Sequence, residues 1–123
     1  MSRVFLLEDH SWFRKALAGL LEREADLQVV GEASSLSEAR GAVTAKSGQI
    51  DLALIDLLLP DGIGTDLIGD LRRANPEVPV LVLTVARDPD LHTWVRSMGA
   101  DEMISKDASI DEILAAIRLL LGR

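Results

Sequence analysis

The sequence contains no cysteine, and among its 123 residues there are only two histidines, two tryptophans and two phenylalanines. Without cysteine, disulfides, thiolate metal sites and a cysteine nucleophile are excluded. No apolar run approaches the roughly 18 residues that a membrane-spanning helix requires. The run Val4–Leu7 near the N-terminus is too short for the hydrophobic region of a secretory signal. We therefore expect a cytoplasmic protein that does not enter a membrane.

Basic residues are outnumbered, because 13 Lys and Arg face 20 Asp and Glu and give a net charge of −7. Nucleic-acid-binding domains are usually basic, since neutralising phosphates drives their affinity. The chain is therefore not expected to bind nucleic acid directly. Its length predicts a single domain over residues 1–123, and a hydrophobic content of 48% suffices for one core.

Short apolar runs alternate along the chain with amphipathic stretches. The predicted strands are Val4–Leu7, Leu27–Val30, Leu52–Ile55, Val78–Leu83 and Glu102–Ile104. The predicted helices are His10–Arg23, Ser35–Ala45, Asp88–Met98 and Ser109–Leu121, together with a helix that follows the turn Pro60–Gly62 and ends near Ala74. The helices that begin at Ser35 and Ser109 open with capping boxes, which include Glu38 and Glu112. Strands that are apolar on both faces suit a parallel sheet covered by helices on both sides. The predicted fold is therefore α/β, a doubly wound, five-stranded parallel sheet of the flavodoxin-like (βα)5 type.

Chemically useful side chains follow the predicted strands. In an open α/β sheet, ligands bind beyond the carboxyl ends of the strands. At these ends the sequence places Glu8 and Asp9, Asp56, Thr84 and Lys106. Three carboxylates, one hydroxyl and one ammonium are thus expected to converge on one edge of the sheet.

Three carboxylates in one crevice repel one another, at about 4 kcal/mol for two charges ~4 Å apart near a protein surface. Such a cluster favours a cation, and ligands that are all hard oxygens favour Mg²⁺ or Mn²⁺ over zinc. The chemistry that fits is transfer of a phosphoryl group to a carboxylate nucleophile. Asp56 would attack, Lys106 would neutralise charge, and Thr84 would donate a hydrogen bond to the phosphate.

Four motifs occur in order along the whole chain, and together they resemble the response-regulator receiver domain of two-component systems. They are Val4–His10, Asp56–Gly64, Val80–Thr84 and Gly99–Ala108. Within that family the pair Asp9-His10, the stretch Val29–Ala33 and the segment Lys106–Ser109 are similar to the NarL/LuxR-type branch.

The resemblance implies a signalling role rather than an enzyme, with at most slow self-dephosphorylation. A sensor histidine kinase would phosphorylate Asp56, with Mg²⁺ held by Asp9, Asp56 and the main-chain carbonyl of Leu58, and by Glu8 through water. Phosphorylation would change conformation and dimerisation. It would control transcription through a helix-turn-helix output domain beyond Arg123, outside this chain. The resemblance also implies that the chain can form a homodimer.

Two residues depart from the family pattern. Met103 stands where the family often places Tyr or Phe, three residues before the lysine, as a rotamer switch. Methionine is flexible and can fill the same space. Val85 follows the hydroxyl position, where a small residue is common. Its branched side chain is expected to narrow access to Asp56.

Two other functions remain open at this point. An aspartyl-nucleophile phosphohydrolase commonly has a second acid two residues after the nucleophile, and this chain has Leu58 there, so no general acid is placed. An interaction module that works without phosphorylation is the other alternative, and Met103 and Val85 are consistent with it.

The remaining histidines and tryptophans have simpler interpretations. His10 is expected at a helix start and His92 on an exposed helix face. Trp94 is expected in the core, because Leu91, Val95 and Met98 lie at helical spacing from it. Trp12 either packs partly or contacts a kinase or a second protomer.

Overall fold

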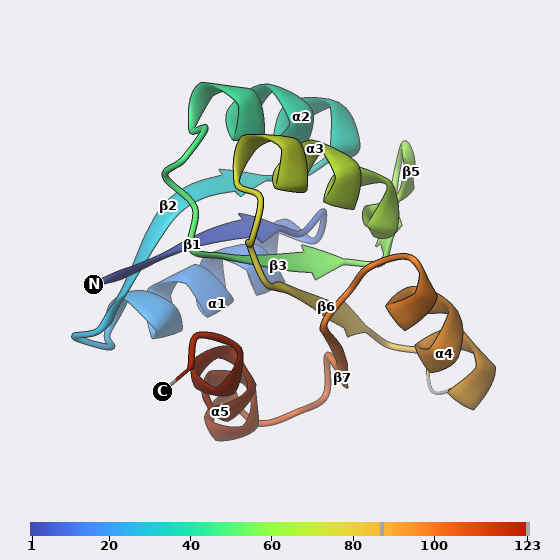
Figure 1. Cartoon of the computed structure of the whole chain (residues 1–123). Coiled ribbons are helices and arrows are strands. Elements are labelled where there is room, and N and C mark those ends of the chain that lie inside the picture. Colours follow the sequence, from blue (N-terminus) through green and yellow to red (C-terminus); the bar gives the residue numbers. More distant parts are fainter. Residues whose placement is uncertain (87, 123) are drawn as a thin grey trace.

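A computed structural model of the chain describes residues 1–86 and 88–122 (Figure 1). The central sheet consists of β1 (Ser2–Leu7), β2 (Leu27–Ala33), β3 (Leu52–Asp56), β6 (Val80–Thr84) and β7 (Glu102–Ser105). These strands are parallel and follow the order β2-β1-β3-β6-β7. The helices are α1 (Ser11–Glu22), α2 (Leu36–Ala45), α3 (Ile68–Ala74), α4 (Pro89–Ser97) and α5 (Ile110–Leu120).

Helices cover both faces of the sheet (Figure 1). α2 and α3 lie on one face and α1 and α5 on the other, with α4 beside the ends of β6 and β7. This arrangement confirms the predicted doubly wound, flavodoxin-like fold. In residues 1–86 and 88–122, no helix has both the length and the apolar character needed to cross a bilayer.

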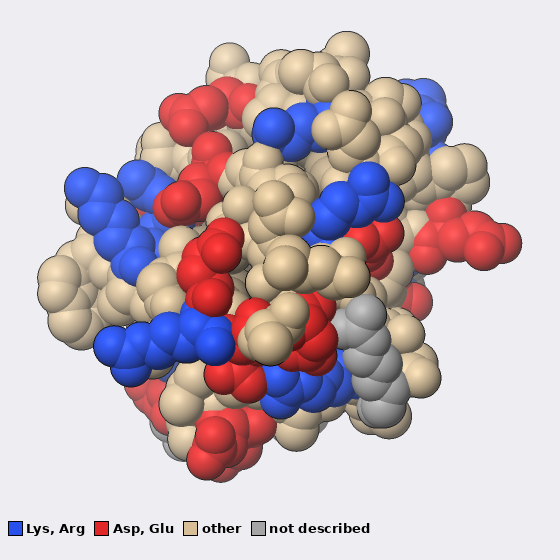
Figure 2. Space-filling model, turned by 90° about the vertical axis from the view of Figure 1, so that its left-hand side faces the viewer, with Lys and Arg blue, Asp and Glu red and all other residues tan. Residues whose placement is uncertain are grey.

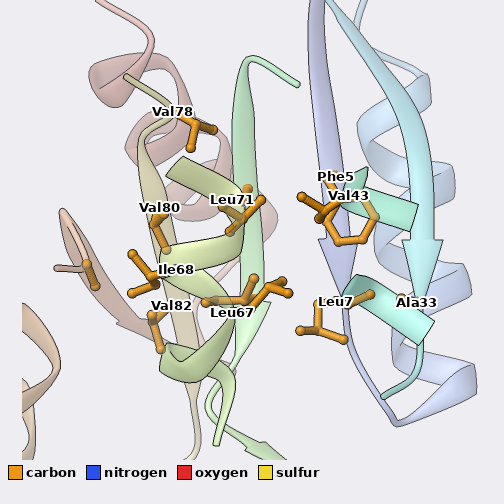
Figure 3. Close-up of a cluster of buried hydrophobic side chains, with 14 of the residues drawn as sticks. Phe5, Leu7, Ala33, Val43, Leu67, Ile68, Leu71, Val78, Val80 and Val82 are labelled. Atoms are coloured by element: carbon orange, nitrogen blue, oxygen red, sulfur yellow. The ribbon is translucent and has the colours of Figure 1, made fainter. Parts of the chain in front are cut away.

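The strand β1 divides the core in two, because successive side chains of a strand point to opposite faces. Phe5 and Leu7 enter the cluster under α2 and α3 (Figure 3). Val4 and Leu6 enter the cluster under α1 and α5. All four are fully buried, and burying a side chain of this kind contributes about 1.5–3 kcal/mol. The apolar run at the N-terminus therefore contributes to the core on both faces of the sheet.

Some predicted boundaries were wrong. β2 extends to Ala33 instead of Val30, because it continues to pair with β1 as far as Leu7. β6 begins at Val80 rather than Val78, since the amide of Val78 bonds to Asn75 in a turn. The turn Pro60–Gly62 is the tip of a small hairpin, β4 (Leu58–Leu59) and β5 (Gly62–Ile63). A 3₁₀ turn, Gly64–Leu67, then leads into α3.

The helix starts follow the predicted capping pattern. The hydroxyls of Ser35 and Ser109 accept hydrogen bonds from the main-chain N–H groups of Glu38 and Glu112, both at 3.2 Å. Such a cap satisfies an N–H group that has no partner within the helix and stabilises it by roughly 1 kcal/mol.

The expectation that Trp94 packs in the core was wrong. Trp94 is 39% exposed and Met98, one turn further, is 43% exposed. Val95 is fully buried and Leu91 packs partly against the cluster under α2 and α3. Helix α4 therefore presents a narrow face to the core, and residue 94, turned about 100° from Val95, lies on its flank. On α1, Leu20 is likewise 37% exposed.

The edge at which the strands begin carries both signs of charge, which are intermixed in Figure 2. Arg3 pairs with Asp51 at 3.0 Å, and Arg118 of α5 pairs with Glu24 at 2.7 Å and Asp26 at 3.0 Å. Partly exposed pairs of this kind contribute about 0–1 kcal/mol each. At this edge arginines thus pair with the carboxylates, whereas three carboxylates and one lysine gather at the opposite strand ends.

Gly64 is expected to tolerate no larger side chain. A Cβ atom there would lie 2.0 Å from the main-chain oxygen of Asp56. A Gly64→Ala variant should lose about 3 kcal/mol or more in free energy of unfolding, because main chain has to move. Gly41→Ala in α2, where nothing lies within 4 Å, is the matched control and should gain about 0.4–1 kcal/mol. Urea unfolding measures both, and equal stability of Gly64→Ala and wild type would contradict the close approach.

Candidate functional site

Three carboxylates meet at the carboxyl ends of two neighbouring strands. Glu8 and Asp9 follow β1, and Asp56 is the last residue of β3. The strands are adjacent and in register, with Leu7 beside Ile55. One oxygen from each of the three carboxylates lies within 4.8 Å of the others. Glu8 and Asp56 are buried, while Asp9 is exposed.

Lys106, the residue after β7, reaches into this cluster. Its Nζ lies 2.5 Å from Oε1 of Glu8 and 3.1 Å from Oδ2 of Asp56. Its main-chain N–H donates to the carbonyl of Thr84 at 2.9 Å, which ties the residue to the end of β6. The predicted convergence of Lys106 with the carboxylates is therefore present in the structure.

The other predicted site residues surround the cluster at different depths. Thr84 is 2% exposed and its hydroxyl accepts from the N–H of Ala86 at 3.1 Å. Met103 is partly buried against the cluster under α2 and α3. Val85 and Leu58 are 63% and 60% exposed. Thr84 thus belongs to the interior of the site, and Val85 and Leu58 belong to its solvent-facing rim.

Two residues near the site were missed by sequence reasoning. Arg14 of α1 donates from Nη1 to the main-chain carbonyl of Glu8 at 2.8 Å and pairs with Glu32 at 3.5 Å. The ring of Phe13 lies 5.1 Å from Nζ of Lys106, a cation–π distance. Arg14 thus holds the acidic segment in place, and Phe13 holds the lysine. Neither residue type carries a signal of this role in the sequence.

The histidines have the roles expected of them. His10 precedes α1 as its N-cap residue without a side-chain cap, and its main-chain N–H donates to Oε2 of Glu8 at 2.9 Å. His92 lies on α4 and accepts from Arg96 at 3.1 Å. Trp12 is 74% exposed, so only a minor part of its surface packs within the chain.

Burial and the nearby charges shift the pKa values of the side chains in the cluster. Burial raises the pKa of Asp56 to about 7, helped by its hydrogen bond with Asp9 and by the charge of Glu8, against the effect of Lys106. Burial alone would raise the pKa of Asp9, but hydrogen bonds with Asp56 and Glu8 outweigh it and lower this pKa. Desolvation likewise acts against Lys106, yet its contacts with Glu8 and Asp56 raise its pKa. At neutral pH the cluster is therefore short of positive charge.

The donor set fits a hard divalent cation. Three carboxylates face one ammonium, and burial, followed by the hydrogen bond with Asp9 and the charge of Glu8, raises the pKa of Asp56. A divalent ion among these oxygens would offset the negative charge of the carboxylates, and oxygen ligands of this kind suit Mg²⁺. The chain contains no cysteine, and its histidines are at a helix start and on α4. The composition of the cluster therefore favours magnesium over zinc.

In Mg²⁺-free buffer, the stability of the wild type is expected to fall relative to an Asp56→Asn variant as pH rises from about 4 to about 7. The pKa of Asp56 is about 7 in the folded protein against an ordinary value of 3.8, so the folded state binds the proton more tightly and ionisation costs folding free energy. By pH 8 the variant should be more stable by on the order of 2–3 kcal/mol. Urea unfolding across this range measures the difference.

A variant at the opposite edge of the sheet should show the opposite pH dependence of stability. Hydrogen bonds from Arg3 lower the pKa of Asp51. The contribution of Asp51 to the free energy of unfolding is therefore present above pH 3.8 and is lost as pH falls. Asp51→Asn should therefore be less stable than the wild type at neutral pH, with the difference shrinking in acid. A pH-independent gain for Asp56→Asn would contradict the raised pKa.

Known proteins resemble the chain over nearly its whole length. The profile of the response regulator receiver domain matches residues 4–118. The DNA-binding transcriptional activator DevR/DosR of Mycobacterium tuberculosis is 36% identical over 118 residues, which are 96% of this chain and 54% of that protein. The KDP operon transcriptional regulatory protein KdpE of Escherichia coli is 37% identical over 123 residues, 100% of this chain and 52% of that protein.

Solved structures agree with these matches. The signal receiver domain of NarL from Mycobacterium tuberculosis superposes with a TM-score of 0.86 at 27% identity, covering 99% of this chain and 98% of that one. The chain spans about half the length of the curated relatives it matches.

Proposed function

The chain belongs to the response regulator receiver domain family, and on this basis we propose that Asp56 accepts a phosphoryl group from the phosphohistidine of a sensor histidine kinase. The family match confirms the resemblance that the four sequence motifs predicted. The similar proteins and structures also confirm the resemblance to the NarL/LuxR-type branch. Receiver domains of this family act in signalling rather than as enzymes. The proposal therefore concerns which residues of this chain accept, hold and report the phosphoryl group.

One observation carries the proposal. The carboxylate of Asp56 is buried in the acidic cluster, 3.1 Å from the ammonium of Lys106 and beside Glu8 and Asp9. A carboxylate that would act as the nucleophile, a positive charge and a group of carboxylates that would hold a divalent cation thus lie together. Phosphoryl transfer depends mainly on such positioning and on neutralising charge.

The transfer step conserves atoms and charge in a simple way. An oxygen of Asp56 attacks phosphorus, a P–O bond forms, and the P–N bond of the phosphohistidine breaks. The bonding electrons leave with the imidazole nitrogen. The product is an acyl phosphate on Asp56. Because Asp56 must be ionised to attack, its pKa of about 7 in the metal-free protein makes a nearby cation favourable for reaction at neutral pH.

Side chains of Asp9 and Asp56 and the main-chain carbonyl of Leu58 would hold Mg²⁺, with Glu8 acting through water. The bound ion supplies charge neutralisation for the phosphoryl oxygens. Lys106, whose raised pKa keeps it protonated, offers the second positive charge. Mn²⁺ has the same oxygen preference and would substitute.

Thr84 and Lys106 would report the phosphorylated state. Both are tied to strand ends that lie side by side, since the N–H of Lys106 bonds to the carbonyl of Thr84. Their movement toward the phosphoryl group would shift the population of two conformations. Met103 on β7 would transmit the change, and Val85 at the rim would slow exchange with small donors and water. The lifetime of the acyl phosphate in Val85→Ala, compared with the wild type, measures the last point.

The wider role follows from the relatives. DevR/DosR is a DNA-binding transcriptional activator and KdpE a transcriptional regulatory protein. The output would be control of transcription in the cytoplasm, through homodimerisation and a DNA-binding domain that lies outside these 123 residues. The receiver domain itself, with its charge of −7, would not contact DNA.

Incubation with a small-molecule phosphoryl donor tests the proposal. In the presence of Mg²⁺, intact-mass spectrometry should show the gain of one phosphoryl group per chain, and chelation of the metal should prevent it. A multiple-turnover release of phosphate would favour the phosphohydrolase alternative. No gain with Mg²⁺ and intact fold would favour an interaction module that works without phosphorylation.

A further inference from the structure

The tip of the hairpin formed by β4 and β5 is fastened to the start of α2. Asp61 accepts hydrogen bonds from the main-chain N–H of Leu36 at 2.9 Å and of Ser37 at 3.0 Å. The first N–H groups of a helix have no partner within it, so Asp61 caps α2 from a distant part of the chain. These hydrogen bonds lower the pKa of Asp61. The tip thus carries a charged acceptor at neutral pH.

Two glycines let the hairpin fit closely at both of its ends. Gly62 has φ +152°, and a Cβ there would lie 2.6 Å from Cδ1 of Leu36, the residue whose amide Asp61 binds. At the base, the N–H of Gly64 donates to the carbonyl of Leu57 at 2.7 Å. The hairpin is therefore held at its base beside Asp56 and at its tip against α2.

Such a short hairpin depends on these attachments. Each strand has two residues, and an isolated two-stranded hairpin is at best marginally stable in water. Leu58, the first residue of β4, supplies the proposed main-chain ligand of the cation, and its side chain is 60% exposed, so side-chain packing gives it little support. The position of its carbonyl depends on the two ends of the hairpin.

We propose that Asp61 is a positioning residue for cation binding, which holds the hairpin against α2 and thereby keeps the Leu58 carbonyl in place to bind Mg²⁺. The inference rests on the proposed function, since Leu58 is a ligand only there. It adds that the start of α2, whose residues Leu36 and Ser37 lie 20 and 19 positions before Asp56 in the chain, takes part in the metal site through main-chain contacts with Asp61. Partners that orient metal ligands without touching the metal commonly affect affinity.

Mg²⁺ titration by calorimetry tests the inference on the whole chain, at a temperature well below unfolding. Asp61→Ala should weaken the Mg²⁺ Kd about tenfold, at the lower end of what the loss of a supporting partner costs. Asp61→Asn keeps one acceptor oxygen and should fall between Asp61→Ala and the wild type. Hydrogen exchange of the Gly64 amide should become faster in Asp61→Ala, whether or not Mg²⁺ is added.

Ser35→Ala is the matched control. Ser35 caps the same turn of α2 by accepting from Glu38, but its hydroxyl does not bond to the hairpin in the structure of residues 1–86 and 88–122. Its loss should lower the thermal midpoint about as much as Asp61→Ala, while the Mg²⁺ Kd stays within about twofold of the wild type. The comparison separates a weakened α2 from a displaced hairpin.

The outcomes are distinguishable. If the wild type binds Mg²⁺ and Asp61→Ala binds it equally well, the positioning role is refuted while the metal site stands. If Ser35→Ala weakens binding as much as Asp61→Ala, the effect belongs to α2 in general and the inference is overturned. If the wild type does not bind Mg²⁺ at all, the proposed metal site fails and the inference fails with it.

Discussion

An Asp56→Asn variant is expected to lose phosphorylation by at least about a thousandfold, the scale that removal of a covalent nucleophile produces. Asparagine matches aspartate in shape, but its amide nitrogen is not a nucleophile and its oxygen carries no charge. The 3.1 Å contact with Lys106 places this one carboxylate beside the positive charge that phosphoryl transfer requires. The rate of phosphoryl incorporation from a small-molecule donor with Mg²⁺ measures the loss.

Asp51→Asn serves as the control for this change. Asp51 is also an aspartate next to the start of β3, but it pairs with Arg3 at the opposite edge of the sheet. Its replacement should leave the rate of incorporation within about twofold of the wild type. Circular dichroism and urea unfolding should show that Asp56→Asn is folded. A folded Asp56→Asn variant that is labelled at the wild-type rate would show that another residue accepts the phosphoryl group.

Lys106→Met is expected to slow phosphorylation by about a hundredfold, because removing one charge that stabilises the transition state typically costs that much or more. Methionine keeps an unbranched apolar stem and so preserves packing beside Phe13. The same variant should lose on the order of 2 kcal/mol of stability at pH 8 without Mg²⁺, since Glu8, which is 1% exposed, then lacks its ion-pair partner. Labelling reactions quenched at successive times measure the rate of phosphorylation, and urea unfolding measures the stability.

Lys15→Ala, at an exposed position on α1, is the control for loss of a lysine elsewhere and should leave both quantities nearly unchanged. Added Mg²⁺ should restore part of the stability of Lys106→Met, because a cation replaces the missing charge in the cluster. If the variant is as stable and as readily phosphorylated as the wild type, Lys106 has neither of the proposed roles.

Much of the fold and the cluster could be predicted because both depend on regular features of the chain. The apolar runs identify the strands, and in a parallel sheet every carboxyl end lies on the same edge. The residues after the runs therefore come together without any knowledge of side-chain contacts. That is why Asp56, Asp9, Glu8 and Lys106 lie together as expected.

Residues that act through tertiary contacts could not be found in this way. Arg14 bonds to the carbonyl of Glu8, and Asp61 bonds to amides of α2 that lie 24 and 25 positions away. Both look like ordinary surface charges in the sequence, since no periodic pattern specifies their partners. Trp94 shows the converse error. Helical spacing predicted that it packs, but the width of the buried face of α4 depends on how that helix meets the sheet.

Locating the phosphoryl group on the wild-type chain tests the central claim most directly. After reaction with a small-molecule donor and Mg²⁺, reductive trapping of the acyl phosphate and peptide mass spectrometry should place the modification on Asp56 alone. Modification of Thr84, Glu8, Asp9 or a remote residue in place of Asp56 would contradict the account.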